Sequence, residues 1–213
     1  MLLNSGKSIL LWVSLLFFSL SILHADELQN LTNSYNAKKQ EYLDYIKRFS
    51  AEDQKAKSIK NEYLKLEKQI KLLKIINSDD NFTSLSPDTE INDDFLIRLS
   101  SGDILPNAQT DYILGWLNFK YYSLQNALSL FNLSLLKYSS YTNIPKKLYL
   151  SIALVYFRIA ESSEKSKQNP LFTLCKEYIK KAGDLSHTDY SSIADTLEKK
   201  ADAYIELNRT KKK

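Results

Sequence analysis

The amino-acid sequence predicts an all-α protein, with a long helical segment over 26–77 followed by a domain of paired helices over 108–209. The 213 residues include only four Gly and four Pro, so helix breakers are few, while 44% of residues are apolar and can form a core. Apolar residues recur at helical spacing in both segments. Turn residues separate them and predict a linker over 78–107, and a short basic tail occupies 210–213.

The first 25 residues have the pattern of a secretory signal peptide. Lys7 supplies the positive charge, and the apolar run from Ser8 to Leu23 is shorter than the roughly 20 residues that span a membrane comfortably. Ala25 is a plausible cleavage position, although Leu23 is larger than usual two places before it. An uncleaved N-terminal anchor is the alternative. Both interpretations predict an exported protein that is periplasmic or associated with the membrane in the cell envelope.

The segment over 26–77 carries a heptad pattern of apolar and aromatic residues, which predicts a helix with one apolar seam. The candidate seam residues are Tyr35, Tyr42, Tyr45, Phe49, Ile59, Tyr63, Leu66 and Ile70. A helix of this length cannot bury the seam on itself. It needs a second helix, supplied either by the same chain or by another copy, so a homo-oligomer through 26–77 is possible.

Two interpretations of 26–77 compete. A continuous helix is favoured, because the heptad phase is kept across Ser50 and no Gly or Pro marks a turn. The alternative is a helical hairpin that folds back between Phe49 and Asp53. Ser50-Ala-Glu-Asp53 resembles a capping box that could begin a second helix.

The rest of the chain predicts a linker and then a series of helices. A short helix is expected within Asp93–Ser100, with Gly102 at its end and Pro106 closing the linker. The later helices are expected at about 108–122, 124–138, 145–163, 170–182 and 189–208, with a polar loop over 164–169.

Small and large residues are spaced in these helices as in a tetratricopeptide repeat. Gly115 precedes Ala127 by twelve residues, and Phe131 follows four later. A second unit and a closing helix repeat this spacing in part, with Tyr149, Ala153, Tyr156, Cys175, Ile179, Ala182, Leu197, Ala201 and Tyr204. The C-terminal half therefore resembles a divergent tetratricopeptide-repeat domain. Asp111 and Asn118 depart from the pattern, and Ala153 lies twenty-two residues before Cys175, so a generic five-helix bundle is the alternative.

The resemblance implies a partner-binding groove lined by the first helix of each pair. The implied lining residues are Tyr112, Trp116, Phe119, Lys120, Leu154, Phe157 and Arg158. Aromatic residues exposed in a concave surface suit peptide binding. The alternative is that the short linker helix or the N-terminal helix covers these side chains and makes them ordinary core.

The composition gives little support to catalysis or cofactor binding. Outside the leader, His187 is the one histidine, which excludes the usual zinc sites, and Cys175 occupies a packing position. A net charge of +4 gives no strong reason to expect nucleic acid as a partner. We therefore expect no metal, no cofactor and no enzymatic activity.

The order of signal peptide, long helical segment and repeat-like domain resembles that of periplasmic proteins of cell-wall and division machinery. The Lys-, Asn-, Ile- and Tyr-rich composition resembles exported proteins of spirochaetes of the Borrelia type. These resemblances imply a scaffold that binds another cell-envelope protein through the groove, the N-terminal helix or both. The alternative is a membrane-anchored spacer protein with a self-associating coiled coil.

Overall fold

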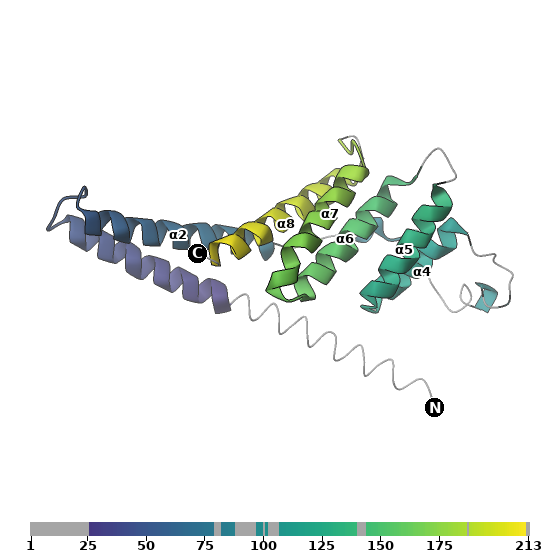
Figure 1. Ribbon diagram of the computed structural model, residues 1–213, viewed down its shortest axis with the longest axis horizontal. Coiled ribbons are helices and arrows are strands. Elements are labelled where there is room, and N and C mark those ends of the chain that lie inside the picture. Colours follow the sequence, from purple (N-terminus) through teal and green to yellow (C-terminus); the bar gives the residue numbers. More distant parts are fainter. Residues whose placement is uncertain are drawn as a thin grey trace, which may run out of the picture. The chain divides into compact units, whose positions relative to one another are not determined.

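A computed structural model describes residues 26–78, 82–87, 97–99, 101, 107–139, 144–186 and 188–211. All regular elements in these ranges are helices, which confirms the all-α prediction (Figure 1). The predicted leader, most of the predicted linker helix, and His187 lie outside the described residues. Within the described ranges, the structure has no helix with the length and hydropathy needed to cross a membrane.

The described chain falls into two compact units. One contains 26–78 together with the C-terminal residues from Glu206 onward, and the other runs from Phe82 to Ile205. The last helix, α8 (Ser191–Lys211), contributes residues to both units.

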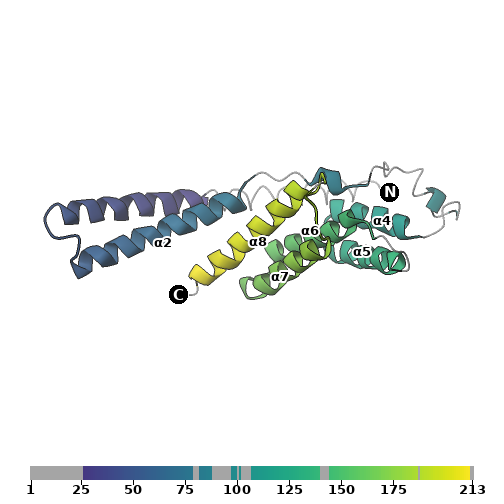
Figure 2. The same cartoon turned by 90° about the horizontal axis from the view of Figure 1, so that it is seen from above.

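The N-terminal segment is a helical hairpin. One helix spans 26–46, a turn follows, and α2 (Gln54–Ile76) runs antiparallel to the first helix (Figures 1 and 2). The favoured prediction of a continuous helix is therefore wrong, and the hairpin alternative is what the chain adopts. Asp53, and not Ser50, caps the second helix, with its side chain accepting from the backbone N–H of Lys55 at 2.7 Å. The Asp53 side chain therefore begins the second helix, and the turn needs no Gly or Pro.

Aromatic contacts join the two helices of the hairpin. The ring of Tyr63 lies 6.1 Å from that of Tyr35 and 5.5 Å from that of Tyr42. Lys38 adds an ion pair across the hairpin, with its Nζ 3.0 Å from an oxygen of Glu62. These contacts bring residues of the predicted seam together within one chain.

The second unit contains two helix pairs, each formed by helices adjacent in sequence. The first pair is α4 (Ala108–Lys120) with α5 (Leu124–Tyr138), and the second is α6 (Lys146–Ser162) with α7 (Lys165–Lys181). α5 also packs on α6, so the pairs are stacked in chain order (Figure 2). The predicted helix over 124–138 is confirmed at both ends.

A close approach between α4 and α5 holds the first pair together. A Cβ atom placed at Gly115 would lie 2.5 Å from Cε1 of Phe131, so the ring occupies the space that a side chain would take. Ala127 is fully buried on α5, and the hydroxyl of Ser134 donates to the carbonyl of Ala108 at 2.6 Å. The predicted small-to-large contact in this pair is confirmed.

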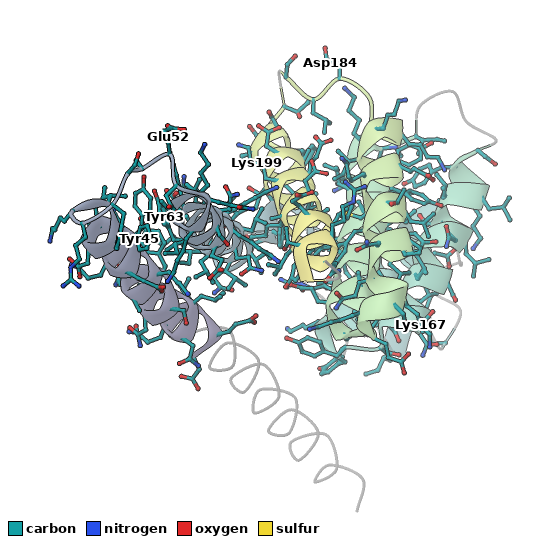
Figure 3. All side chains as sticks on the ribbon, turned by 60° about the vertical axis from the view of Figure 1, so that its left-hand side comes forward. Tyr45, Glu52, Tyr63, Lys167, Asp184 and Lys199 are labelled. Atoms are coloured by element: carbon teal, nitrogen blue, oxygen red, sulfur yellow. The ribbon has the colours of Figure 1, made fainter. Side chains whose placement is uncertain are left out.

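The second pair differs from the prediction in its connection. α6 ends at Ser162 and α7 begins at Lys165, so the expected polar loop over 164–169 is mostly helix and Pro170 lies inside α7. The long spacing between Ala153 and Cys175 therefore comes from longer helices and not from a longer loop. Figure 3 marks the two ends of α7, with Lys167 in its first turn and Asp184 after its last.

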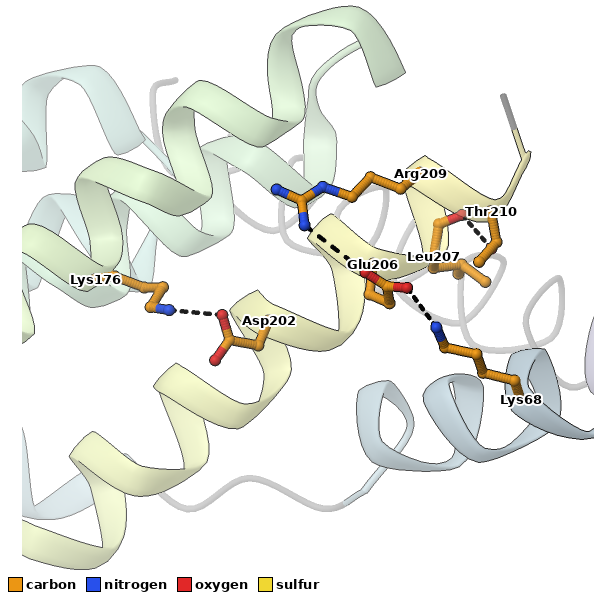
Figure 4. A network of polar contacts seen from close by, with 7 residues as sticks. All are labelled: Lys68, Lys176, Asp202, Glu206, Leu207, Arg209 and Thr210. Atoms are coloured by element: carbon orange, nitrogen blue, oxygen red, sulfur yellow. Dashed lines mark hydrogen bonds and ion pairs between the residues drawn. The ribbon is translucent and has the colours of Figure 1, made fainter. Parts of the chain in front are cut away.

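α8 closes the second unit through aromatic and charged contacts. The ring of Tyr204 stacks on Phe172 of α7, with centroids 4.7 Å apart, and lies 6.0 Å from Phe157 of α6. Asp202 accepts from Lys176 of α7 at 2.6 Å (Figure 4). The C-terminal turns of α8 belong to the other unit, where Glu206 forms an ion pair with Lys68 of α2 (Figure 4).

Candidate functional site

A short segment of the predicted linker covers one face of α4 and α6. The segment, residues 82–87, contains the 3₁₀ turn η1 (Thr83–Leu85), which packs against α6. The side chain of Leu85 is fully buried. The hydroxyl of Tyr112 on α4 donates to the carbonyl oxygen of Leu85 and also lies 3.3 Å from the hydroxyl of Ser151 on α6. The two helices therefore hold this segment jointly, through one apolar side chain and one main-chain carbonyl.

The other end of the segment lies on a charged and aromatic cluster. The guanidinium carbon of Arg158 lies 5.8 Å from the centre of the Phe82 ring, within the range of a cation–π contact. Arg158 donates to Glu161 at 2.7 Å, and the other carboxylate oxygen of Glu161 accepts from the hydroxyl of Tyr204 at 3.1 Å. This network fixes the Arg158 side chain, because its charge is paired and its partner is held in turn by α8.

The predicted groove residues lie mostly in the core. Tyr112, Trp116, Leu154 and Phe157 are buried, Phe119 and Arg158 are half-buried, and Lys120 is exposed. The expectation of an open aromatic groove is therefore corrected in favour of the alternative in which the chain covers these side chains. The rings of Tyr112 and Trp116 pack against Phe131 of α5, and Phe157 packs against Phe172 and Tyr204. The 82–87 segment adds contacts to the Tyr112 hydroxyl and to Arg158.

One buried polar group on this face has no acceptor in the part of the chain that is described. Trp116 is 9% exposed, and its indole N–H makes no hydrogen bond there. It lies one helical turn from Tyr112, whose hydroxyl does donate to the segment. A buried N–H without an acceptor costs about 1–3 kcal/mol, so this site favours the arrival of a carbonyl oxygen.

The 82–87 segment is held by few side chains. Thr83 and Ser84 are exposed, whereas Phe82, Ser86 and Pro87 are half-buried and Leu85 is fully buried. Burying one leucine contributes about 1.5–3 kcal/mol. Fixing the backbone of one residue costs about 1–2 kcal/mol. The segment is therefore held less strongly than the helices beneath it, whose cores contain several buried side chains.

The predicted seam residues lie in the hairpin and are buried to different degrees. Ile59 and Ile70 are buried, and Tyr35, Tyr42, Tyr45, Tyr63 and Leu66 are half-buried. Phe49 lies in the turn, is 56% exposed and stacks on Tyr45 with ring centroids 4.7 Å apart. Phe49 is not part of the seam, because the first helix ends before this residue.

The described residues carry little reactive chemistry. Cys175 is buried on α7, and this burial raises the pKa of its thiol to about 12, which keeps it protonated and unreactive at neutral pH. No cluster of acidic, histidine and cysteine side chains among the described residues could hold a metal ion.

Sequence reasoning missed Phe82, Leu85 and Ser151 as parts of this site. The signal that could have found the first two is a Phe and a Leu three residues apart inside a stretch otherwise made of turn residues. Apolar residues in a linker that carries no helical pattern need a surface to cover.

Comparison of the chain with protein-family models, with curated proteins and with solved structures finds no match. Its function must therefore be inferred from its own residues.

Proposed function

We propose that the protein is a non-enzymatic scaffold of the bacterial cell envelope, exported through its first 25 residues, that binds another envelope protein through a divergent tetratricopeptide-like domain. The close approach of Gly115 to Phe131 in the first helix pair supports the repeat interpretation, as does the full burial of the small residues Ala153 and Cys175 in the second pair. The spirochaetal origin suggested by the composition is part of the same proposal.

The observation that carries this proposal is the seating of an irregular chain segment on α4 and α6. Tyr112 donates to a main-chain carbonyl of that segment, and Leu85 is buried there. Both contacts depend on backbone and on one apolar side chain, which any suitable peptide can supply. A face that holds one peptide segment in this way is suited to hold another.

The test is cross-linking in native cells, followed by affinity capture of the tagged full-length chain and mass spectrometry. Tyr112→Phe is the informative variant, because it removes the hydroxyl donor and keeps the ring that packs on Phe131. We expect it to lose envelope proteins that the wild type captures. Lys165→Ala is the control, because Lys165 is exposed in the first turn of α7 and is not one of the predicted groove residues. Equal capture by all three proteins would contradict the assignment of the partner to this face.

A second candidate function is a membrane-anchored spacer that self-associates through the hairpin. The observation in its favour is that the seam of the first helix is only half-buried in the chain, while Leu43 and Leu64 are 39% and 42% exposed. Light scattering on the full-length chain in detergent tests it. A dimer that Leu43→Glu converts to a monomer would support the spacer, and a monomeric wild type would contradict it.

A further inference from the structure

The segment 82–87 contacts α4 and α6 as a bound peptide would. The segment consists of a 3₁₀ turn followed by Ser86 in an extended conformation. Its Leu85 side chain is buried, and the Leu85 carbonyl accepts from the hydroxyl of Tyr112. Three residues before Leu85, the ring of Phe82 lies against the Arg158 guanidinium. A main-chain hydrogen bond and two side-chain anchors at fixed spacing together specify a short sequence pattern.

We propose that residues 82–87 are an internal ligand, which occupies a recognition site for a partner segment that carries Phe and Leu three residues apart. This inference rests on the proposed function and names the chemistry of the partner. Arg158 is the selective group for the aromatic residue, since its position is fixed by Glu161. The site of Leu85 favours an apolar side chain, because Leu85 is fully buried there.

The indole N–H of Trp116, one helical turn from Tyr112 on α4, is a donor that the internal ligand does not pair. This buried N–H has no acceptor among the described residues, although Tyr112 is paired with the segment. A partner segment whose backbone extends along α4 could place a carbonyl there and gain a hydrogen bond that 82–87 does not make. This difference gives a partner an advantage over the internal segment.

The internal ligand has the effect of a competitor. Residues 82–87 are tethered to the site, so their effective concentration there is high. A partner binds only those molecules in which this segment has dissociated from the site. Removing its anchors raises the fraction of such molecules. The apparent affinity for a partner segment should rise by the same factor without any change to the site.

The probe for this test is a fluorescein-labelled peptide with the sequence of residues 80–89, added to the purified full-length chain and followed by fluorescence anisotropy. We expect the variant Phe82→Ala/Leu85→Ala to bind the probe at least about tenfold more tightly than the wild type does. Ser84→Ala is the matched control, because Ser84 is exposed in the same segment, and it should bind as the wild type binds. A probe with Ala at both anchor positions should not bind.

Failure of the double variant to bind more tightly than the wild type, with helical circular dichroism retained, would overturn the inference. If the double variant loses its helical signal, the single variant Phe82→Ala takes its place, since that ring is only half-buried. Adding Tyr112→Phe should weaken probe binding in the double-variant background, where the internal segment no longer competes for that hydroxyl. No envelope protein takes part in this assay, so its outcome is distinguishable from failure of the capture experiment that tests the proposed function.

Discussion

Gly115 of α4 and Phe131 of α5 lie so close that a methyl group on the first would come within 2.5 Å of the ring of the second. Phe131 is 1% exposed, and Tyr112 and Trp116 pack on it at centroid distances of 5.6 and 6.1 Å, so the ring has little room to move. This contact sets the distance between the two helices and, with it, the position of Tyr112.

Gly115→Ala should destabilise the protein. Alanine favours a helix over glycine by about 1 kcal/mol, but overpacking a core costs about 1–3 kcal/mol. We expect a net loss of up to about 2 kcal/mol in the free energy of unfolding, measured in urea. Adding Phe131→Leu, which removes the contacted ring edge, should restore part of the loss. Increased stability of Gly115→Ala would show that the two helices are not in this close contact.

We expect Lys137 to contribute to the stability of the fold although its side chain is 39% exposed. Its Nζ lies 2.6 Å from Oδ2 of Asp111, a carboxylate that is 6% exposed on α4 and makes no hydrogen bond through that oxygen in the described chain. Lys137→Met leaves this buried charge without its cation and should cost about 2 kcal/mol of stability. The double variant Asp111→Asn/Lys137→Met should cost less than Lys137→Met alone. Equal stability of the wild type and Lys137→Met in urea would contradict this role.

The hairpin can be tested by chemical cross-linking. The side chains of Lys38 and Glu62 form an ion pair across it at 3.0 Å, so Lys38→Cys/Glu62→Cys should be joined within one chain by a short bis-maleimide reagent. In a continuous helix the two positions would be about 36 Å apart and could not react. The pair Lys38→Cys/Lys74→Cys is the control, because position 74 lies about 18 Å further along α2. Mass spectrometry after proteolysis identifies the cross-linked peptides.

Cys175 should resist thiol reagents until the chain unfolds. Burial raises the pKa of its thiol to about 12 from an ordinary value of 9.0, so thiolate is scarce in the folded chain at pH 8. Because the folded pKa lies above the unfolded one, this thiol's contribution to stability is complete below pH 9 and declines as the pH rises towards 12. Labelling with iodoacetamide at pH 8 should need a denaturant, and rapid labelling of the native chain would contradict the burial of Cys175.

The parts of the fold that local sequence determines were predictable. The helix at 124–138 and the Gly115–Phe131 contact follow from apolar periodicity and from the spacing of small and large residues. A continuous helix was favoured over the hairpin because no Gly or Pro marks the turn, whereas Asp53 caps the second helix through its side chain and needs neither. The start of α7 was placed too late because Pro170 usually marks a first turn, yet it lies in the sixth position of this helix.

The covered face could not be predicted from local pattern at all. Tyr112 contacts a carbonyl 27 residues earlier in the chain, and nothing in the periodicity of either segment links them. The resemblance to a repeat family placed Tyr112, Leu154 and Phe157 on the first helix of each pair, but exposure depends on what else the chain places there.

The central claim is that residues 82–87 lie on the face formed by α4 and α6. The most direct measurement is the free energy of unfolding in urea of Leu85→Ala, compared with the wild type and with Ser84→Ala. Leu85 is fully buried and Ser84 is exposed, so we expect Leu85→Ala to lose about 2 kcal/mol and Ser84→Ala to change by less than about 0.5 kcal/mol. Equal stability of the three proteins would mean that the segment does not lie on this face, and would contradict the account.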